Sequence, residues 1–130
     1  MNETRTLASF ASEMRYEDLS PEALAKIKGL ILDQLGVELA TSNKPWSLGI
    51  YRSSASSGGK PESTVVYFGD RLPVMSAAFI NACFGHGFEI DDIYPPGLSH
   101  PGTVIIPAAM ALGEREGING KRLILAVATG

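Results

Sequence analysis

The feature that most constrains the fold is a run of apolar residues at helical spacing between Ser20 and Thr41. These residues recur at steps of three and four, and they are Leu24, Ile27, Ile31, Leu35 and Leu39. Such spacing marks the buried face of an amphipathic helix. Ser20 suits the N-cap position, and Pro21 suits the first helical turn. The sequence therefore predicts one long helix from Pro21 to about Thr41.

The rest of the chain is also mainly helical in its pattern. We predict helices over residues 4–15, 46–56, 101–116 and 120–129, and another that begins at Pro73. Ser63 to Phe68 is the one strand-like run. The predicted fold class is mainly α, with at most one short strand, in a single helical domain over residues 1–130. The last predicted helix stops with the chain and leaves its apolar half without a partner, so we expect an N-terminal part of a longer protein.

The composition argues against several classes of function. Of the 130 residues, 45% are hydrophobic and 19% charged, and no apolar run is long enough to span a bilayer. A net charge of −3 without a Lys/Arg stripe argues against a nucleic-acid partner. Cys83 is the single cysteine, so no internal disulfide is expected, and the N-terminus lacks a signal-peptide pattern. We therefore expect a cytoplasmic protein with no membrane role.

Three carboxylates and both histidines of the chain lie within residues 86–100, which we call the acid segment. They are His86, Glu89, Asp91, Asp92 and His100. Apolar runs flank the segment, and carboxylates held beside buried walls are candidates for shifted pKa values and proton transfer. If the preceding helix continues through Asp92, then His86, Glu89 and Asp92 fall on neighbouring parts of one helix face.

His100 directly precedes Pro101, the expected first residue of the next helix. The positive end of a helix dipole favours the neutral imidazole, which keeps His100 available as a base near neutral pH. The same helix end offers free backbone N–H groups to a carboxylate or phosphate. The sequence thus predicts a base and an anion site in one place.

Each of these residues also has a structural interpretation. A helix-capping histidine is more often structural than catalytic, and Asp91 with Asp92 can simply cap a turn. The histidines and carboxylates of the acid segment match none of the compact metal-ligand spacings, so we expect no metal and no cofactor. Cys83 lies in an apolar helix, where a buried, inert thiol is expected.

A series of short motifs resembles, in its order along the chain, the N-terminal part of the MmgE/PrpD family. That family includes 2-methylcitrate dehydratase, cis-aconitate decarboxylase and iminodisuccinate epimerase. The motifs are Leu32-Asp33-Gln34-Leu35-Gly36-Val37, Ala77-Ala78-Phe79-Ile80-Asn81, the stretch from His86 to Asp92, His100-Pro101 leading to Ile106-Pro107-Ala108, and Gly117-Ile118-Asn119-Gly120. The resemblance spans nearly all of the chain. It implies a large helical domain plus a smaller α+β lid domain, usually in homodimers, with the active site between the domains.

The resemblance also implies a chemistry. Members act on small di- and tricarboxylates without an iron–sulfur cluster, by moving a proton next to a carboxylate and expelling water or carbon dioxide. It matches His100 to the family's active-site histidine, a general acid/base, and implies that the acid segment lines the same pocket. The expected site residues are the catalytic group His100, Glu89, Asp91 and Asp92 and the substrate-binding group His86, Ile93 and Ser99.

Two departures from the family limit what the resemblance implies. Members commonly read Asp-Phe-Asp-Asp-Thr where this chain has Glu89-Ile90-Asp91-Asp92-Ile93. The later histidine, lysines and tyrosine of the family's pocket have no counterpart here, so we do not expect these 130 residues to turn over substrate alone. For the full-length protein we expect dehydration of a 2-methylcitrate-like acid, with decarboxylation or epimerisation of a related acid as alternatives. A non-catalytic helical module that binds a partner chain stays open as a different class of function.

Overall fold

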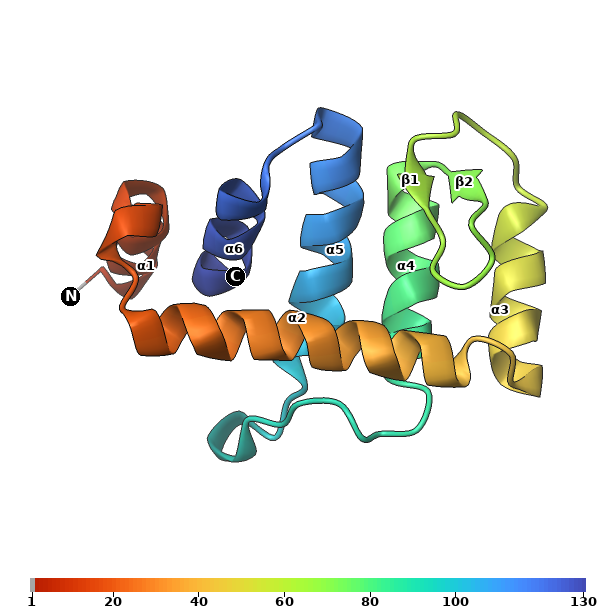
Figure 1. The fold of residues 1–130 in the computed structure, drawn as a ribbon, viewed down its shortest axis with the longest axis horizontal. Coiled ribbons are helices and arrows are strands. Elements are labelled where there is room, and N and C mark those ends of the chain that lie inside the picture. The colour runs from red at the N-terminus through yellow and green to blue at the C-terminus, as the bar shows by residue number, and fades with distance from the viewer. Residues whose placement is uncertain (1) are drawn as a thin grey trace.

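The structure is a computed structural model that describes residues 2–130, and it is mainly α-helical (Figure 1). In chain order the elements are α1 (Glu3–Glu13), η1 (Tyr16–Asp18), α2 (Pro21–Thr41), α3 (Pro45–Ala55), β1 (Ser63–Thr64), β2 (Arg71–Leu72), α4 (Val74–Gly85), η2 (Pro95–Gly97), α5 (Pro101–Glu116) and α6 (Gly120–Thr129). The predicted fold class is confirmed. The single predicted strand over residues 63–68 is instead a pair of two-residue antiparallel strands, with Ser63 opposite Leu72.

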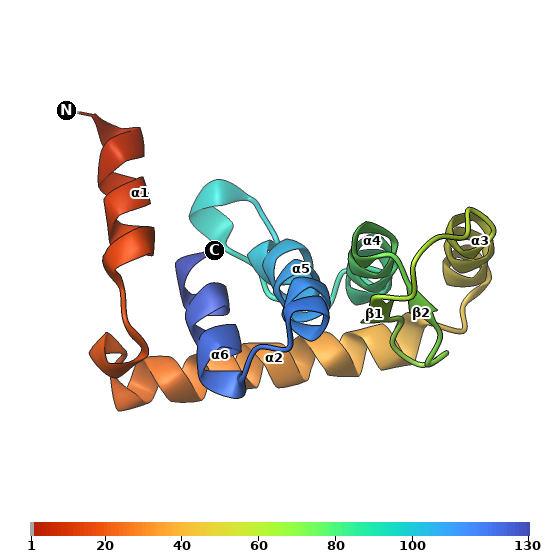
Figure 2. The ribbon, with the colours of Figure 1, turned by 90° about the horizontal axis from the view of Figure 1, so that it is seen from above.

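Helices α3, α4, α5 and α6 stand side by side in a row, and α2 runs crosswise along that row (Figures 1 and 2). The α4–α5 pair forms the most extensive contact in the molecule, and α2 packs against α4, α5 and α6. Helix α1 stands apart near the start of α2 and contains no buried residue. Within residues 2–130, none of the helices has both the length and the apolar character that a bilayer crossing demands.

The hydrophobic core lies where α4 meets α5 and the strand pair. Its fully buried side chains include Val65, Ala77, Ile80 and Phe84, with Ala111 contributed by α5. The Tyr51 and Phe68 rings stack beside this core, and the Phe68 ring also contacts the Phe84 ring. Burial of this apolar surface is the main force that holds the row of helices together.

Helix α2 begins as predicted, but its buried face differs from the predicted one. Ser20 caps it by accepting a hydrogen bond from the backbone N–H of Ala23 (3.1 Å). Of the five predicted apolar positions only Ile27 is buried, and Leu39 is 51% exposed. The buried positions in the second half of α2 are Gln34, Val37, Glu38 and Thr41. Three of these four are polar, so α2 meets α4 and α5 through hydrogen-bonding groups as well as apolar ones.

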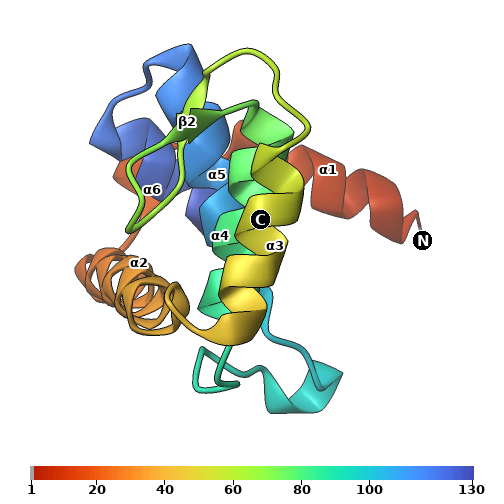
Figure 3. The same cartoon turned by 90° about the vertical axis from the view of Figure 1, so that its right-hand side faces the viewer.

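The α4–α5 pair has two functionally different ends (Figures 1 and 3). The β1–β2 pair leads into the start of α4 and lies beside the C-terminal part of α5. The acid segment connects the opposite ends of the same two helices, and Figure 3 shows it hanging below them. The fold therefore holds the acid segment at both of its ends by well-packed helices.

Candidate functional site

The acid segment starts where α4 ends, and close packing against α2 fixes that end. Gly85 is the last residue of α4, and a Cβ there would overlap the side-chain amide of Gln34 on α2. Thr41, also on α2, donates its hydroxyl to the carbonyl oxygen of Phe84. Because only glycine allows this approach, α2 and the last turn of α4 form one rigid support under the segment.

The chain turns sharply as soon as α4 has ended. The Glu89 N–H donates to the His86 carbonyl (3.2 Å), and Glu89 has a left-handed φ of 51°. The helix therefore ends at Gly85 and does not continue through Asp92, the condition on which the shared helix face depended. His86, Glu89 and Asp92 do not share a helix face, and the turn replaces the expected alignment.

Asp91 lies at the centre of the site. Its carboxylate has no solvent exposure, and both of its oxygens lie 3.1 Å from Nδ1 of His86. His100 approaches the same carboxylate, with Nδ1 3.2 Å from Oδ2, although the two atoms are not aligned for a hydrogen bond. The two imidazole rings meet edge to face with centroids 4.8 Å apart. The turn after α4 and the start of α5 thus bring two histidines to one buried carboxylate.

Asp92 has a different position from its neighbour Asp91. Its Oδ1 accepts a hydrogen bond from the backbone N–H of Gly102 (2.9 Å), in the first turn of α5. A Cβ at Gly102 would overlap the Asp92 carboxylate, so glycine is needed for this contact. His100 occupies the N-cap position as predicted, but its side chain makes no capping hydrogen bond. One N–H group expected to bind an external anion is therefore already taken by Asp92.

The other expected site residues lie on the outer surface of the acid segment. Glu89 and Ser99 are exposed, and the Ile93 side chain is 59% exposed. The backbone N–H of Tyr94 donates to the Ser99 carbonyl (2.8 Å), which closes the loop around η2. The structure thus brings together His86, Asp91 and His100. Glu89, Ile93 and Ser99 face solvent instead.

Two open recesses flank the histidine–aspartate cluster. One, of about 510 Å³, lies between α2 and the acid segment and is lined by Lys26, Asp33, Asp91 and Asp92 among others. The other, of about 460 Å³, is mainly apolar; His86 lines it together with Phe79. The His86 side chain is 42% exposed and the His100 side chain 25%. Both histidines are therefore open to small molecules, whereas the Asp91 carboxylate is not.

The same three side chains are also of the types that bind metal ions. His86, Asp91 and His100 each offer one donor atom, and those atoms lie within 4.8 Å of one another. Two imidazoles and a carboxylate are a ligand set used by zinc and iron. Here Nδ1 of His86 is within hydrogen-bonding distance of both carboxylate oxygens, which is the geometry of an imidazole–carboxylate pair, and Nδ1 of His100 lies 3.2 Å from one of them. Asp91 is the one carboxylate of the acid segment in this group, and Glu89 and Asp92 lie outside it.

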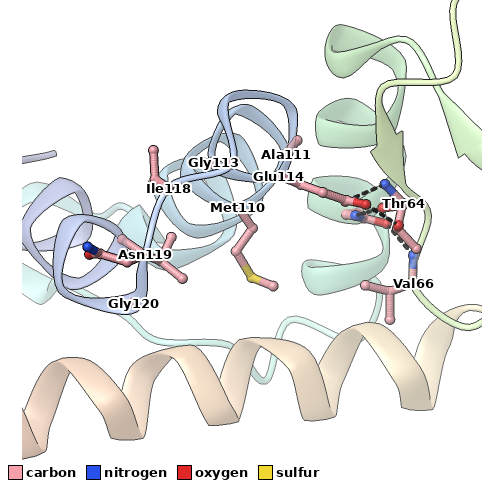
Figure 4. A pocket seen from close by; sticks show the side chains of 12 residues that line it. Thr64, Val66, Met110, Ala111, Gly113, Glu114, Ile118, Asn119 and Gly120 are labelled. Carbon is pink, nitrogen blue, oxygen red and sulfur yellow. Dashed lines mark hydrogen bonds between the residues drawn. The ribbon is translucent and has the colours of Figure 1, made fainter.

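A third cavity lies at the far end of α5, near β1 and α6 (Figure 4). It has a volume of about 410 Å³ and mainly apolar walls, and the Met110 side chain lines it. Its polar groups are already engaged: the Glu114 carboxylate accepts two 2.7 Å hydrogen bonds from Thr64, and Asn119 caps α6. No histidine lines this cavity, so the acid segment is the better candidate for proton chemistry.

Comparison with known proteins shows which proteins the chain is similar to. The profile of the MmgE/PrpD N-terminal domain matches residues 5–130. The chain belongs to the MmgE/PrpD family. It is 27% identical over 120 residues to cis-aconitate decarboxylase of Aspergillus terreus, which covers 92% of this chain and 24% of that protein. It is 30% identical over 119 residues to cis-aconitate decarboxylase of Mus musculus, covering 85% of this chain and 23% of that protein. The chain spans about a quarter of the length of these relatives.

The MmgE/PrpD match confirms the resemblance inferred from the short motifs, and it includes the whole acid segment. Two buried polar residues of α2, Gln34 and Glu38, had no role in the sequence-based prediction of the site. Gln34 belongs to the first motif, and its amide donates to the Glu38 carboxyl (3.0 Å) inside the buried face of α2. Burial raises the pKa of Glu38 to about 7, and the Gln34 hydrogen bond offsets part of that rise. Two polar residues four positions apart on an apolar helix face were the available signal.

Proposed function

We propose that this chain is the N-terminal, proton-transferring part of a lyase that acts on small tricarboxylates, and that decarboxylation of a cis-aconitate-like acid is its reaction. The observation that carries the proposal is the buried Asp91 carboxylate between His86 and His100, in a chain related to cis-aconitate decarboxylases. Histidine is the side chain best suited to exchange a proton near neutral pH. The relatives' names favour decarboxylation over the 2-methylcitrate dehydration expected from the sequence alone.

The chemistry of the proposed reaction needs one proton at a defined carbon. When a carboxylate leaves as carbon dioxide, the electron pair of the broken C–C bond stays on the substrate and must be captured by a proton. His100, as the imidazolium with a hydrogen on both ring nitrogens, donates the proton from Nε2 to carbon and regains one from water, so no other reactant is needed. A general acid in this position contributes roughly 10²- to 10⁴-fold to the rate.

The other site residues take supporting roles in this proposal. Asp92 anchors the first turn of α5 through the Gly102 N–H and so holds His100 in place. Glu89, Ile93 and Ser99 lie on the exposed side of the acid segment, where they can contact substrate once the rest of the protein covers it. Ile93 offers substrate an apolar contact and no hydroxyl.

We also propose that the complete gene product is a cytoplasmic homodimer. Large apolar side chains stay uncovered on neighbouring helices; Phe79 on α4 is 56% exposed and Trp46 on α3 is 49% exposed. Such contiguous apolar surface is characteristic of an interface. Light scattering should give twice the monomer mass. The intact mass of the protein recovered from its source cells should be several times 13.8 kDa; a mass near 13.8 kDa would favour the non-catalytic module.

The decisive experiment replaces His100 in the complete gene product. Wild-type protein should release carbon dioxide from cis-aconitate, and His100→Ala should lower kcat by about 10²- to 10⁴-fold while the protein stays folded at the assay temperature. Glu116→Gln, at the exposed far end of α5, is the matched control and should turn over like the wild type. Unchanged turnover in His100→Ala would remove His100 from the mechanism. Wild-type protein that converts neither cis-aconitate nor 2-methylcitrate would contradict the proposed substrate class.

A further inference from the structure

The Asp91 carboxylate is too deeply buried to be a substrate ligand. Its side chain has no solvent exposure, although the two imidazoles that it faces are partly exposed. Its oxygens are directed at one atom of each ring, Nδ1, at 3.1 Å for His86 and 3.2 Å for His100. Asp91 therefore acts on a bound molecule only through these two rings.

The contact with Asp91 determines which ring nitrogen is free. A carboxylate is purely an acceptor, so the facing Nδ1 of a neutral imidazole must carry the hydrogen. Nε2, on the opposite side of the ring, is then left with its lone pair and without any contact to Asp91. Free imidazole has no such constraint. One buried carboxylate thus selects this tautomer in His86 through a hydrogen bond and favours it in His100 through its negative charge beside Nδ1.

His86 is the ring that Asp91 holds more completely. Its Nδ1 lies at the same distance, 3.1 Å, from both carboxylate oxygens, whereas His100 faces one oxygen and is not aligned with it. His86 is also the more exposed ring and lines the recess next to Phe79 and Val104. A bound polycarboxylate adds negative charge beside both rings and favours a hydrogen on each Nε2.

We propose that Asp91 is a positioning residue that clamps both histidines through Nδ1, and that His86 is a second substrate-contacting histidine whose Nε2 binds a carboxylate of the acid. This inference rests on the proposed function, in which His100 exchanges the proton. Asp91 fixes the distance and orientation between the two rings. His86 holds one carboxylate of the substrate while His100 addresses the reacting carbon.

The clamp is tested by the tautomer of each ring, which requires no turnover. The complete gene product is labelled with ¹⁵N-histidine, and its spectrum is recorded at a pH where both rings are neutral, with His86→Gln and His100→Gln used for assignment. Both rings of the wild type should carry their hydrogen on Nδ1. In Asp91→Asn the hydrogen should move to Nε2, and Asp18→Asn, an exposed acid in η1, should leave the spectrum unchanged. Nε2–H rings in the wild type, or an unchanged spectrum in Asp91→Asn, would overturn the clamp.

The role of His86 is tested by two amide substitutions that mimic opposite ring nitrogens. In His86→Asn the amide takes the place of Nδ1 and keeps the Asp91 contact but loses Nε2. KM for cis-aconitate should rise at least tenfold while kcat stays within threefold. In His86→Gln the amide reaches the Nε2 position and should recover part of the lost affinity. An unchanged KM in His86→Asn would remove His86 from the binding site.

The two proposals fail separately. If the wild type converts no acid but both rings carry Nδ1–H, the proposed function is wrong and the clamp stands. If His100→Ala abolishes turnover but the rings carry Nε2–H, the lyase stands and the clamp is wrong. A combined loss in Asp91→Asn, with kcat about 100-fold lower and the tautomer changed, is the result expected when both are right.

Discussion

Asp91 and Glu38 are the two acidic side chains that are buried in residues 2–130, and their surroundings differ. Glu38 lies on α2 and contacts the neutral amide of Gln34. Its burial raises its pKa to about 7, which makes the uncharged carboxyl the favoured form in weak acid. Asp91 lies beside two imidazoles, each of which places Nδ1 next to its carboxylate. Burial of a carboxyl is thus not by itself a sign of function, because the partner decides what the buried group can do.

The contrast extends to the two remaining acids of the acid segment. Asp92 is half-buried and caps α5, and Glu89 is exposed at a turn. Four carboxylates near the same helix ends therefore have four different environments. If this description is right, their replacement should change the free energy of unfolding by amounts that decrease in the order Asp91, Glu38, Asp92 and Glu89.

Asp91→Ala should have the largest effect on stability. It removes the hydrogen-bond acceptor of His86 Nδ1 and the carboxylate that lies beside the buried Nδ1 of His100. We expect a loss of about 3 kcal/mol in the free energy of unfolding, because a buried hydrogen bond to a charged group contributes about 1.5 to 3 kcal/mol. Urea unfolding near neutral pH measures this directly. A loss below about 1 kcal/mol would show that the rings do not depend on Asp91.

Glu38→Gln should have the next largest effect, with the opposite sign at high pH. The folded protein keeps this carboxyl protonated between pH 4.5 and about 7, where the unfolded chain ionises it. The free energy of unfolding of the wild type should therefore fall as the pH rises through this window, by about 2 to 3 kcal/mol. Glutamine keeps the shape without the charge, so Glu38→Gln should remove that slope.

The measurement for Glu38 is a series of urea unfolding curves from pH 4 to about pH 8. Above the window Glu38→Gln should be more stable than the wild type, and at its acid end the two should be similar. Glu22→Gln is a suitable control, since Glu22 is exposed in the first turn of the same helix and its pKa is lowered rather than raised. Parallel curves for Glu38→Gln and the wild type would mean that Glu38 ionises as freely when folded as when unfolded.

Asp92→Ala should cost about 1 kcal/mol, the usual loss for a missing helix cap. The Gly102 N–H would lose its acceptor, and the first turn of α5 under His100 would loosen. Asp92→Asn keeps an oxygen in the same position and should retain most of the stability. Thermal unfolding of the two variants separates the cap from the charge. Equal losses in both would assign the effect to the charge instead.

The sequence was sufficient for the helices but not for the strand pair or for the packing between elements. Periodicity and caps gave the bounds of α2 and α5, because these signals are local to each helix. The buried face of α2 was misjudged, since Leu39 is exposed and Gln34 and Glu38 are buried. That choice depends on where Gly85 lets α4 approach, which involves residues about fifty positions apart in the chain.

The candidate site was predictable as a composition and not as a geometry. The clustering of both histidines with three acids was visible in the sequence, and so was the position of His100 at the start of a helix. The sequence could not select Asp91 over Asp92 or Glu89 as the acid between the histidines. That selection depends on the chain path after α4, which ends at Gly85. Glu89 has a left-handed φ in the turn that follows, and Asp91 is buried directly after this turn.

Glu89→Gln should have the smallest effect on stability, within about 0.5 kcal/mol, because the side chain is exposed. Glu89→Gly should be at least as stable as the wild type, since glycine adopts the positive φ of this turn without strain. If Glu89 contacts substrate in the complete protein, Glu89→Gln should lower kcat/KM while the unfolding midpoint stays constant. Asp92→Ala should instead lower the unfolding midpoint more than it lowers kcat/KM. A Glu89→Gln variant that unfolds more easily but turns over normally would show that Glu89 has a structural role. The residues proposed to take part in the reaction would then be His86, Asp91 and His100.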